Sequence, residues 1–214
     1  MVHILSKEFS VVSEFLRELR DKEIQQDRSR FRKNIERVGQ IAAYEISKTM
    51  ESEIHFTTTP LGVAKVKKMK QQPVIATILR AGLPLQRGLN DMFDQADLAY
   101  ISAYRKHTSE TEFEIVLEYV ATPDITDRIL IICDPMLATG QSLVQTYNAF
   151  MEKGKPSKVY LVSVIGSQQG VDYVTSNIPD ADLWIGVIDE KLDQNGYIVP
   201  GLGDAGDLSF GTKL

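Results

Sequence analysis

Residues 128–142 read RILIICDPMLATGQS, an apolar run that ends at an aspartate and continues through a short loop. The run at 128–133 is rich in branched side chains and does not alternate with polar residues, which is typical of a strand covered on both faces in a parallel sheet. A helix-like segment follows at 142–153, and the glycine and proline just beyond it form a helix stop signal. The stretch therefore predicts a strand–loop–helix unit of an α/β protein.

The same alternation extends along most of the chain. Further strands are predicted at residues 53–59, 73–79, 96–104, 158–166 and 181–188. Helices are predicted at residues 8–24, 28–50, 83–93 and 171–176. Strands that alternate with helices indicate an open, mostly parallel sheet flanked by helices. Residues 112–120 alternate charged and apolar side chains, which predicts an antiparallel strand, and together with residues 104–109 they form a hairpin arm that projects from the sheet.

Composition restricts the class of protein further. A chain of 214 residues with 43% apolar and 25% charged residues can form one substantial core, and we expect one domain. The net charge of −5 argues against a nucleic-acid surface, and no apolar segment resembles a signal peptide or a membrane span. The single cysteine, Cys133, cannot form an internal disulfide, which fits a reducing compartment, so we expect a cytoplasmic protein. The lysines of residues 65–70 are interpreted as a solvated turn, and the three scattered histidines do not indicate a zinc site.

The loop after the apolar run has the chemistry of an anion site. Residues 139–142 lie where the next helix begins, so their backbone N–H groups and two hydroxyls converge on the positive end of the helix dipole. The P-loop pattern is absent. The carboxylate of Asp134 suits a vicinal diol, and a phosphate and a diol at the two ends of one loop describe a ribose 5-phosphate. The alternative is that these residues only cap a helix and end a strand.

Three glycines near the carboxyl terminus match the dinucleotide spacing. The segment PGLGDAGD, residues 200–207, contains Gly201, Gly203 and Gly206 as G-x-G-x-x-G. Only eight residues follow Gly206, so a crossover helix with its returning strand does not fit, and this argues against a dinucleotide site. Two alternatives remain: a flexible glycine-rich tail, or a segment whose main chain approaches a flat ligand closely.

The motif DPMLATG resembles the phosphoribosyl pyrophosphate (PRPP) motif of the type I phosphoribosyltransferases. Its sequence is similar to that of the motif in the uracil phosphoribosyltransferase family. Three further segments are similar to segments of that family and follow one another in the same order: ILRAG at residues 78–82, Tyr104-Arg105, and GYIVPGLGDAGD near the end. The resemblance covers the chain from about residue 28 onward. It departs at Gln141, where the family usually has glycine, and across residues 108–123.

The resemblance implies a single phosphoribosyltransferase domain over residues 1–214. It implies a type I phosphoribosyltransferase-like fold: an open, mostly parallel sheet flanked by helices, with a projecting β-hairpin arm and a small hood formed partly by the C-terminal segment. In this arrangement residues 1–52 form N-terminal helices, residues 104–123 a flexible arm that acts as a lid, and residues 189–214 the hood segment that binds the base.

The implied activity is transfer of the phosphoribosyl group from PRPP to uracil, which gives UMP and pyrophosphate. The resemblance assigns PRPP binding to Arg80, Arg105, Asp134, Pro135, Met136, Leu137, Ala138, Thr139, Gly140, Gln141, Ser142 and Asp204. It assigns uracil binding to Ile198, Gly203, Asp204 and Ala205, and catalysis to Asp204 and Arg105. Mg²⁺ is expected to bind with the pyrophosphate of PRPP, with no metal held by the protein alone.

The resemblance also carries expectations about partners. A homodimer or higher homo-oligomer is expected, without nucleic acid or membrane. Activation by GTP, which occurs in some relatives, stays open. A different class also stays open: a phosphoribosyltransferase-like regulator that binds nucleotide and RNA, which would need a basic face that the net charge does not favour.

Overall fold

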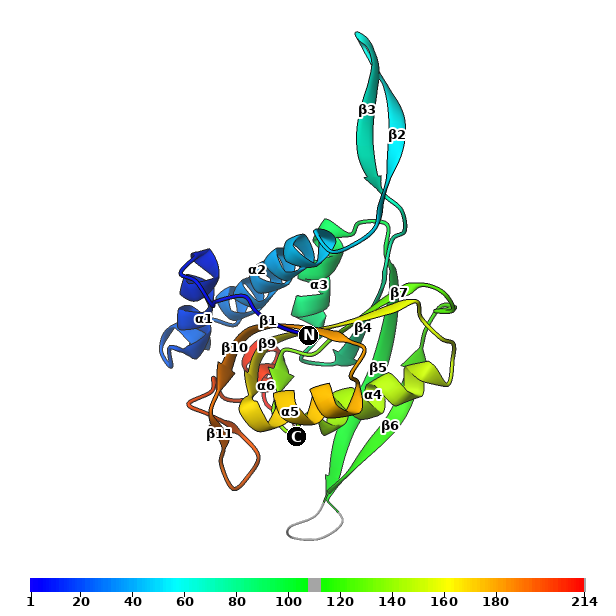
Figure 1. Cartoon of the computed structure of the whole chain (residues 1–214). Helices are drawn as coiled ribbons and strands as arrows, with labels where there is room; N and C mark the ends of the chain where they lie inside the picture. Colours follow the sequence, from blue (N-terminus) through cyan, green and yellow to red (C-terminus); the bar gives the residue numbers. More distant parts are fainter. Residues whose placement is uncertain (108–112, 214) are drawn as a thin grey trace.

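A computed structural model describes residues 1–107 and 113–213, with only the backbone described at 103–107 and 113–118. Within these residues one large sheet has eight strands, in the order β1-β10-β9-β7-β4-β5-β6, with β8 beside β9 (Figure 1). The strands are β1 (Val2–Ile4), β4 (Val74–Leu79), β5 (Asp97–His107), β6 (Phe113–Ala121), β7 (Ile129–Cys133), β8 (Met136–Leu137), β9 (Lys158–Ser167) and β10 (Asp182–Asp189). All neighbouring strands are parallel except β5 and β6, which are antiparallel. The mostly parallel sheet and its antiparallel arm are thus confirmed.

Helices cover both faces of this sheet. They are α1 (Val11–Arg20), a 3₁₀ turn (Ile24–Gln26), α2 (Arg28–Ser47), α3 (Leu83–Met92), α4 (Gln141–Met151), α5 (Gln168–Asn177) and α6 (Ala205–Phe210). The helix predicted at 8–24 ends at Arg20, because the Asp21 carboxylate accepts the N–H groups of Glu23 and Ile24 and turns the chain. No helix in the described ranges is long and apolar enough to span a membrane.

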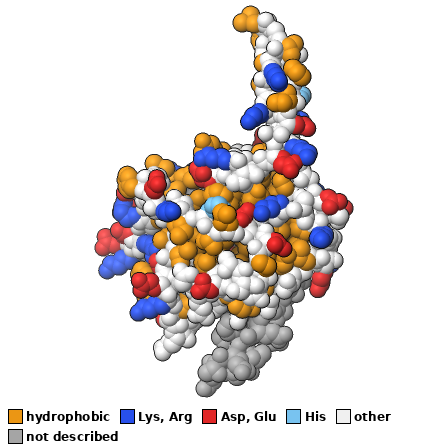
Figure 2. Space-filling view, in the orientation of Figure 1, with side chains coloured by type: hydrophobic (Ala, Val, Ile, Leu, Met, Phe, Trp, Pro, Cys, Tyr) orange, Lys and Arg blue, Asp and Glu red, His pale blue; other side chains and the backbone are white. Residues whose placement is uncertain are grey.

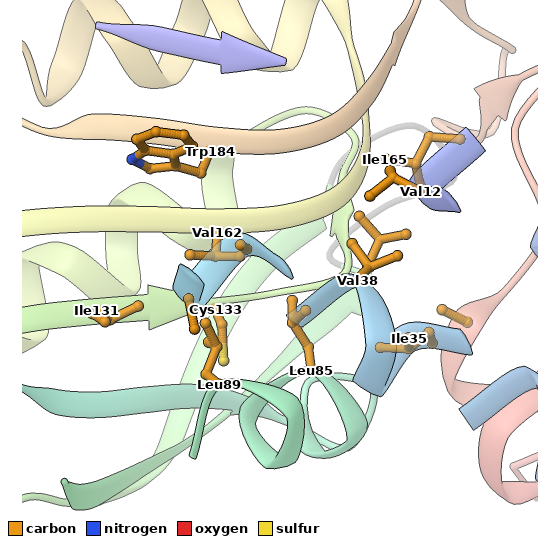
Figure 3. Close-up of a cluster of buried hydrophobic side chains, with 14 of the residues drawn as sticks. Val12, Ile35, Val38, Leu85, Leu89, Ile131, Cys133, Val162, Ile165 and Trp184 are labelled. Atoms are coloured by element: carbon orange, nitrogen blue, oxygen red, sulfur yellow. The ribbon is translucent and has the colours of Figure 1, made fainter. Parts of the chain in front are cut away.

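Strand β7 shows why the run at residues 129–133 is apolar at every position. Ile131 and Cys133 pack into the core under α1, α2 and α3 (Figure 3), whereas Leu130 and Ile132 pack into the core under α4 and α5. Successive side chains of a strand point to opposite faces, so a strand between two helical layers needs an apolar residue at every position.

A second hairpin projects from the side of the molecule opposite to the β5–β6 arm (Figure 1). Strands β2 (Ser52–Thr59) and β3 (Gly62–Met69) form a separate two-stranded sheet. The strand predicted at 53–59 is confirmed, but the interpretation of residues 65–70 as a solvated turn is wrong, since most of these residues belong to β3. The lysines do not alternate regularly with apolar residues, and the strand is exposed on both faces, so no burial pattern distinguishes it from a loop in the sequence.

The C-terminal segment forms two short strands and a short helix. Strands β11 (Lys191–Leu192) and β12 (Ile198–Val199) pair antiparallel, and α6 begins inside the glycine motif. No helix is predicted from the sequence at this position, but the structure has one, α6, which has only six residues. The helix forms because Asp204 caps it: its carboxylate accepts the N–H of Asp207 at 2.9 Å.

Candidate active site

The loop between β7 and α4 is fixed by close packing against the start of α5. Gly140 has a φ of 79°, and a Cβ there would lie 2.9 Å from the backbone oxygen of Gly170. The Ser167 hydroxyl donates to the backbone oxygen of Ala138 at 2.6 Å and accepts the N–H of Gly170 at 2.9 Å. The first N–H groups of α4 have no intrahelical acceptor, so they stay available to an anion at a rigid loop.

Asp134 lies at the carboxyl end of β7, where this loop begins. Its N–H donates to the backbone oxygen of Val162 at 3.1 Å, and its Oδ1 accepts the N–H of Met136 at 3.2 Å. Two of the next residues, Met136 and Leu137, form the short strand β8, which pairs with β9. A small pocket of about 30 Å³ is lined by Asp134 and by the loop up to Ser142. The structure thus brings the carboxylate and the helix N-terminus together around one hollow.

Arg80 follows β4, the neighbour of β7, at the same edge of the sheet. The turn after it packs tightly: a Cβ at Gly82 would lie 3.2 Å from the backbone oxygen of Cys133, next to Asp134. The Arg80 Nη2 donates to Asp207 Oδ1 and to the backbone oxygen of Gly211, each at 3.2 Å. Its Nε is buried and has no hydrogen-bond partner among the described residues. Arg80 therefore links the turn after β4 to α6, and its Nε is a donor that no acceptor among the described residues uses.

The glycine segment lies next to this arginine. A Cβ at Gly206 would lie 3.9 Å from the Cβ of Ala81. Gly203 and Asp204 are exposed, and they line a pocket of about 420 Å³ together with Gln25 and Arg28 from the N-terminal segment. Side chains of the other two residues assigned to uracil, Ile198 and Ala205, are buried in the core, so only their main chain is available to a ligand.

The structure places most of the expected site residues at one edge of the sheet. The segments that carry these residues contact one another at this edge. The residues are Arg80, Asp134, the loop up to Ser142, and Gly203 to Ala205. The side chain of Arg105 lies outside the described residues. Its backbone belongs to β5, three residues beyond Ser102, which pairs with Leu79 at the end of β4. The predicted contacts of residues 108–112 also lie outside the described residues.

Two charged residues at this edge were not found from the sequence. Arg20 and Asp189 form an ion pair that uses both terminal nitrogens of the guanidinium, and the pair contacts Gly201 of the glycine segment. They are 169 positions apart, and neither belongs to a motif, so no local signal marks them. The available signals were only an arginine within the helix predicted at 8–24 and an acid directly after the strand predicted at 181–188.

Burial determines the charge state of two groups near the site. Burial raises the pKa of the Cys133 thiol to about 12, so this cysteine carries no thiolate at neutral pH, which agrees with a packing role. Burial also acts to raise the pKa of Asp189, but the hydrogen bonds from Arg20 and Gly201 outweigh it and hold this pKa below its usual value. Asp189 is therefore a buried, ionised carboxylate.

The described ranges contain no group of three or more histidine, cysteine or acidic side chains that could hold a metal ion. Magnesium commonly binds through one or two carboxylates together with substrate phosphates. Asp134 and Asp204 at the site edge fit such shared binding.

Comparison with solved structures shows that this architecture is the type I phosphoribosyltransferase fold. The structure matches a hypoxanthine phosphoribosyltransferase from Staphylococcus aureus with a TM-score of 0.50 and 14% identity over 74% of each chain, a likeness in fold. The AQ2163 protein from Aquifex aeolicus matches with a TM-score of 0.87 and 27% identity over 100% of both chains.

Sequence comparison gives the family. A model of the uracil phosphoribosyltransferase family matches residues 7–212, and the chain belongs to this family. It is 51% identical to a uracil phosphoribosyltransferase from Porphyromonas gingivalis, over 98% of both chains. It is 41% identical to one from Methanococcus maripaludis, over 85% of this chain and 78% of the relative.

Proposed function

We propose that this protein is a uracil phosphoribosyltransferase that transfers the 5-phosphoribosyl group from PRPP to uracil and releases pyrophosphate. The observation that carries the proposal is the rigid loop at the N-terminus of α4, which faces the same sheet edge as Arg80 and the exposed main chain of Gly203 and Asp204. We also propose that the chain acts as one phosphoribosyltransferase domain, with residues 104–123 as a lid and residues 189–214 as the hood over the base.

The phosphate end of PRPP fits the loop. We assign the 5-phosphate to the N–H groups and hydroxyls of residues 139–142, since a helix N-terminus favours a negative charge. The ribose hydroxyls fit the Asp134 carboxylate, and residues 135–138 supply main chain beside the sugar. Gln141 keeps its N–H as the first residue of α4, so glutamine in place of the usual glycine retains this donor.

The pyrophosphate end fits Arg80 and Arg105. The unused Nε of Arg80 is a donor without an acceptor, and a pyrophosphate oxygen supplies one. Magnesium bound with PRPP would offset the charge of the departing pyrophosphate. Asp134 and Asp204 are the side chains at this edge that fit a shared magnesium site.

The base fits the glycine segment. Uracil presents an acceptor, a donor and an acceptor along one edge, and backbone groups of Ile198, Gly203 and Ala205 can read this pattern because no bulky side chain intervenes. In the reaction the bond from the anomeric carbon to pyrophosphate breaks and a bond to the ring nitrogen forms. The proton of that nitrogen passes to Asp204, which is exposed at the pocket and is the proposed general base.

The test is pyrophosphate release with PRPP and Mg²⁺, measured separately with uracil, cytosine, hypoxanthine and orotate. We expect turnover with uracil and little or none with the others, and a preference for orotate or hypoxanthine would contradict the assignment. Arg80→Gln is expected to raise the KM for PRPP about 10-fold or more, because it removes a charged donor. Arg87→Gln is the matched control, since that arginine is 72% exposed on α3 and is expected to leave both KM values unchanged.

Partners and compartment complete the proposal. We propose a homodimer or higher homo-oligomer, which the exposed apolar side chains of the β2–β3 hairpin support. A cytoplasmic location is supported by the unpaired, buried Cys133. Repeating the assay with added GTP measures whether this protein shares the activation found in some relatives.

A further inference from the structure

A largely buried ion pair joins the end of the first helix, α1, to the end of β10. The Arg20 Nη2 donates to Asp189 Oδ1 at 2.7 Å, and its Nη1 donates to Asp189 Oδ2 at 2.9 Å. The Asp189 side chain is 8% exposed and the Arg20 side chain 24%. A buried carboxylate is costly unless it is paired and hydrogen-bonded, so this geometry fixes both side chains strongly.

The pair also holds both backbone polar groups of Gly201. The N–H of Gly201 donates to Asp189 Oδ2 at 2.9 Å, and its carbonyl oxygen accepts from Arg20 Nη1 at 3.1 Å. Gly201 has a φ of 62°, and a Cβ there would lie 2.0 Å from the backbone oxygen of Ile198, so the turn admits only glycine. The carboxylate and guanidinium therefore replace the regular backbone hydrogen bonds that this turn lacks.

The N-terminal segment makes a second contact one residue further on. With its amide oriented so that both atoms are satisfied, Gln25 donates to the backbone oxygen of Leu202 at 2.8 Å. Leu202 is buried, whereas the next two residues, Gly203 and Asp204, are exposed at the pocket. The Asp204 carboxylate then caps α6. The exposed main chain is thus fixed on its N-terminal side by α1 and the 3₁₀ turn and on its C-terminal side by the cap.

We propose that Arg20 and Asp189 are positioning residues for recognition of the base: they hold Gly201 so that the main chain of Gly203 to Ala205 matches the edge of the pyrimidine. This inference rests on the proposed function and adds a specific consequence to it. Among the described residues, no hydrogen bond or ion pair joins Arg20 or Asp189 to the phosphate loop or to Arg80, so loss of the pair is expected to weaken the interaction with uracil and to spare PRPP.

The experiment measures kcat and the KM for each substrate in the full-length Arg20→Met, Arg20→Lys and Asp189→Asn variants, with thermal unfolding as a check of folding. Arg20→Met is expected to raise the KM for uracil about 10-fold or more, while the KM for PRPP stays within about twofold of the wild type. Arg20→Lys is expected to give a smaller increase, because lysine keeps the charge but cannot bond both carboxylate oxygens and Gly201 at once. Arg17→Met is the matched control, since Arg17 is 53% exposed one turn earlier on α1 and pairs with Glu14.

Each outcome is decisive. An unchanged KM for uracil in folded Arg20→Met, a parallel rise in both KM values, or the same effect in Arg17→Met would overturn the positioning role. If Asp189→Asn does not fold, Arg20→Lys still carries the test, since it keeps the buried charge paired. Failure of the wild type to use uracil contradicts the proposed function itself, whereas a normal wild type with unshifted variants contradicts only the positioning role.

Discussion

Gly140 is a residue at which backbone conformation alone predicts an effect on substrate binding. Its φ of 79° is unfavourable for any side chain, and a Cβ would press against the backbone oxygen of Gly170 at 2.9 Å. Gly140→Ala is therefore expected to shift the loop at the N-terminus of α4 and to raise the KM for PRPP about 10-fold or more, in line with a strain of about 1–2 kcal/mol. Steady-state kinetics at saturating uracil measures this.

Gly62 provides the control for this substitution. It also has a positive φ, of 154°, but a Cβ there would have no atom within 4 Å, and it is the first residue of β3, next to the turn of the β2–β3 hairpin. Gly62→Ala is expected to leave the KM for PRPP unchanged. An equal KM for PRPP in Gly140→Ala and the wild type would show that the loop does not bind the phosphate.

Asp204 combines a structural role with a proposed chemical one, and a single substitution separates them. Its carboxylate caps α6, and asparagine is an equally good N-cap, so Asp204→Asn keeps the helix while it removes the proposed base. Turnover is expected to fall about 100-fold, which is typical for loss of a general base. Product formation under saturating substrates measures it, and near-normal turnover in a folded variant would remove Asp204 from the mechanism.

At the scale of elements, α1 and α2 are joined by a pH-sensitive contact. The Glu18 side chain is 12% exposed, and its carboxylate accepts from Arg30 Nε at 2.9 Å and from Asn34 Nδ2 at 2.7 Å. The hydrogen bonds from Arg30 and then Asn34 lower the pKa of Glu18 to about 2 from the usual 4.5. A lowered folded-state pKa stabilises the protein above the unfolded pKa, so this stabilisation is complete above pH 4.5 and is lost as the pH falls towards 2.

Glu18→Gln should therefore be less stable than the wild type at pH 7, by about 1 kcal/mol because Arg30 is half exposed and screened by solvent. The two proteins should become equally stable as the pH approaches 2. Urea unfolding at a series of pH values measures the difference. Glu14→Gln is the control, since Glu14 lies on the same helix but is 54% exposed, and a pH-independent difference for Glu18→Gln would contradict the interpretation.

Elements buried on both faces were predictable from the sequence, whereas the exposed hairpin was predicted only in part: β2 was found and β3 was not. The apolar runs of β4, β7, β9 and β10 mark their strands because each position packs into one of two cores. Strand β3 was missed because an exposed strand has no burial pattern. Helix α6 was missed because it begins within the glycine motif, where helix formation depends on the Asp204 cap.

The site divides in the same way. The loop after β7 and the glycine segment could be found because each is a local motif in which neighbouring residues share one task. Arg20 and Asp189 could not be found, because their role depends on a contact between residues 169 positions apart. Asp207 stood inside the quoted glycine segment, but its ion pair with Arg80 depends on the placement of α6 and not on spacing.

At the scale of the whole molecule, the β2–β3 hairpin has no core of its own. It extends from the body on the side opposite to the candidate site, and apolar side chains cover much of it (Figure 2). Phe56, Leu61 and Val63 are 65%, 100% and 69% exposed. A two-stranded hairpin is at best marginally stable alone in water, and exposed apolar surface of this kind marks a contact with another chain. These features favour association of two copies through the hairpin.

If two copies associate as proposed, Phe56→Glu is expected to shift the protein towards the monomer, because it would place a charge in the apolar contact. Light scattering coupled to size-exclusion chromatography measures the mass against 24.0 kDa for one chain. Thr57→Glu is the control, because it adds the same charge at the next position of β2, where the side chain points to the opposite face of the hairpin. A wild type that is monomeric at the micromolar concentrations of the assay, or a Phe56→Glu variant with the wild-type mass, would contradict association through this hairpin. Since the candidate site lies on the opposite side of the molecule, the monomeric variant is expected to bind PRPP with a KM close to that of the wild type.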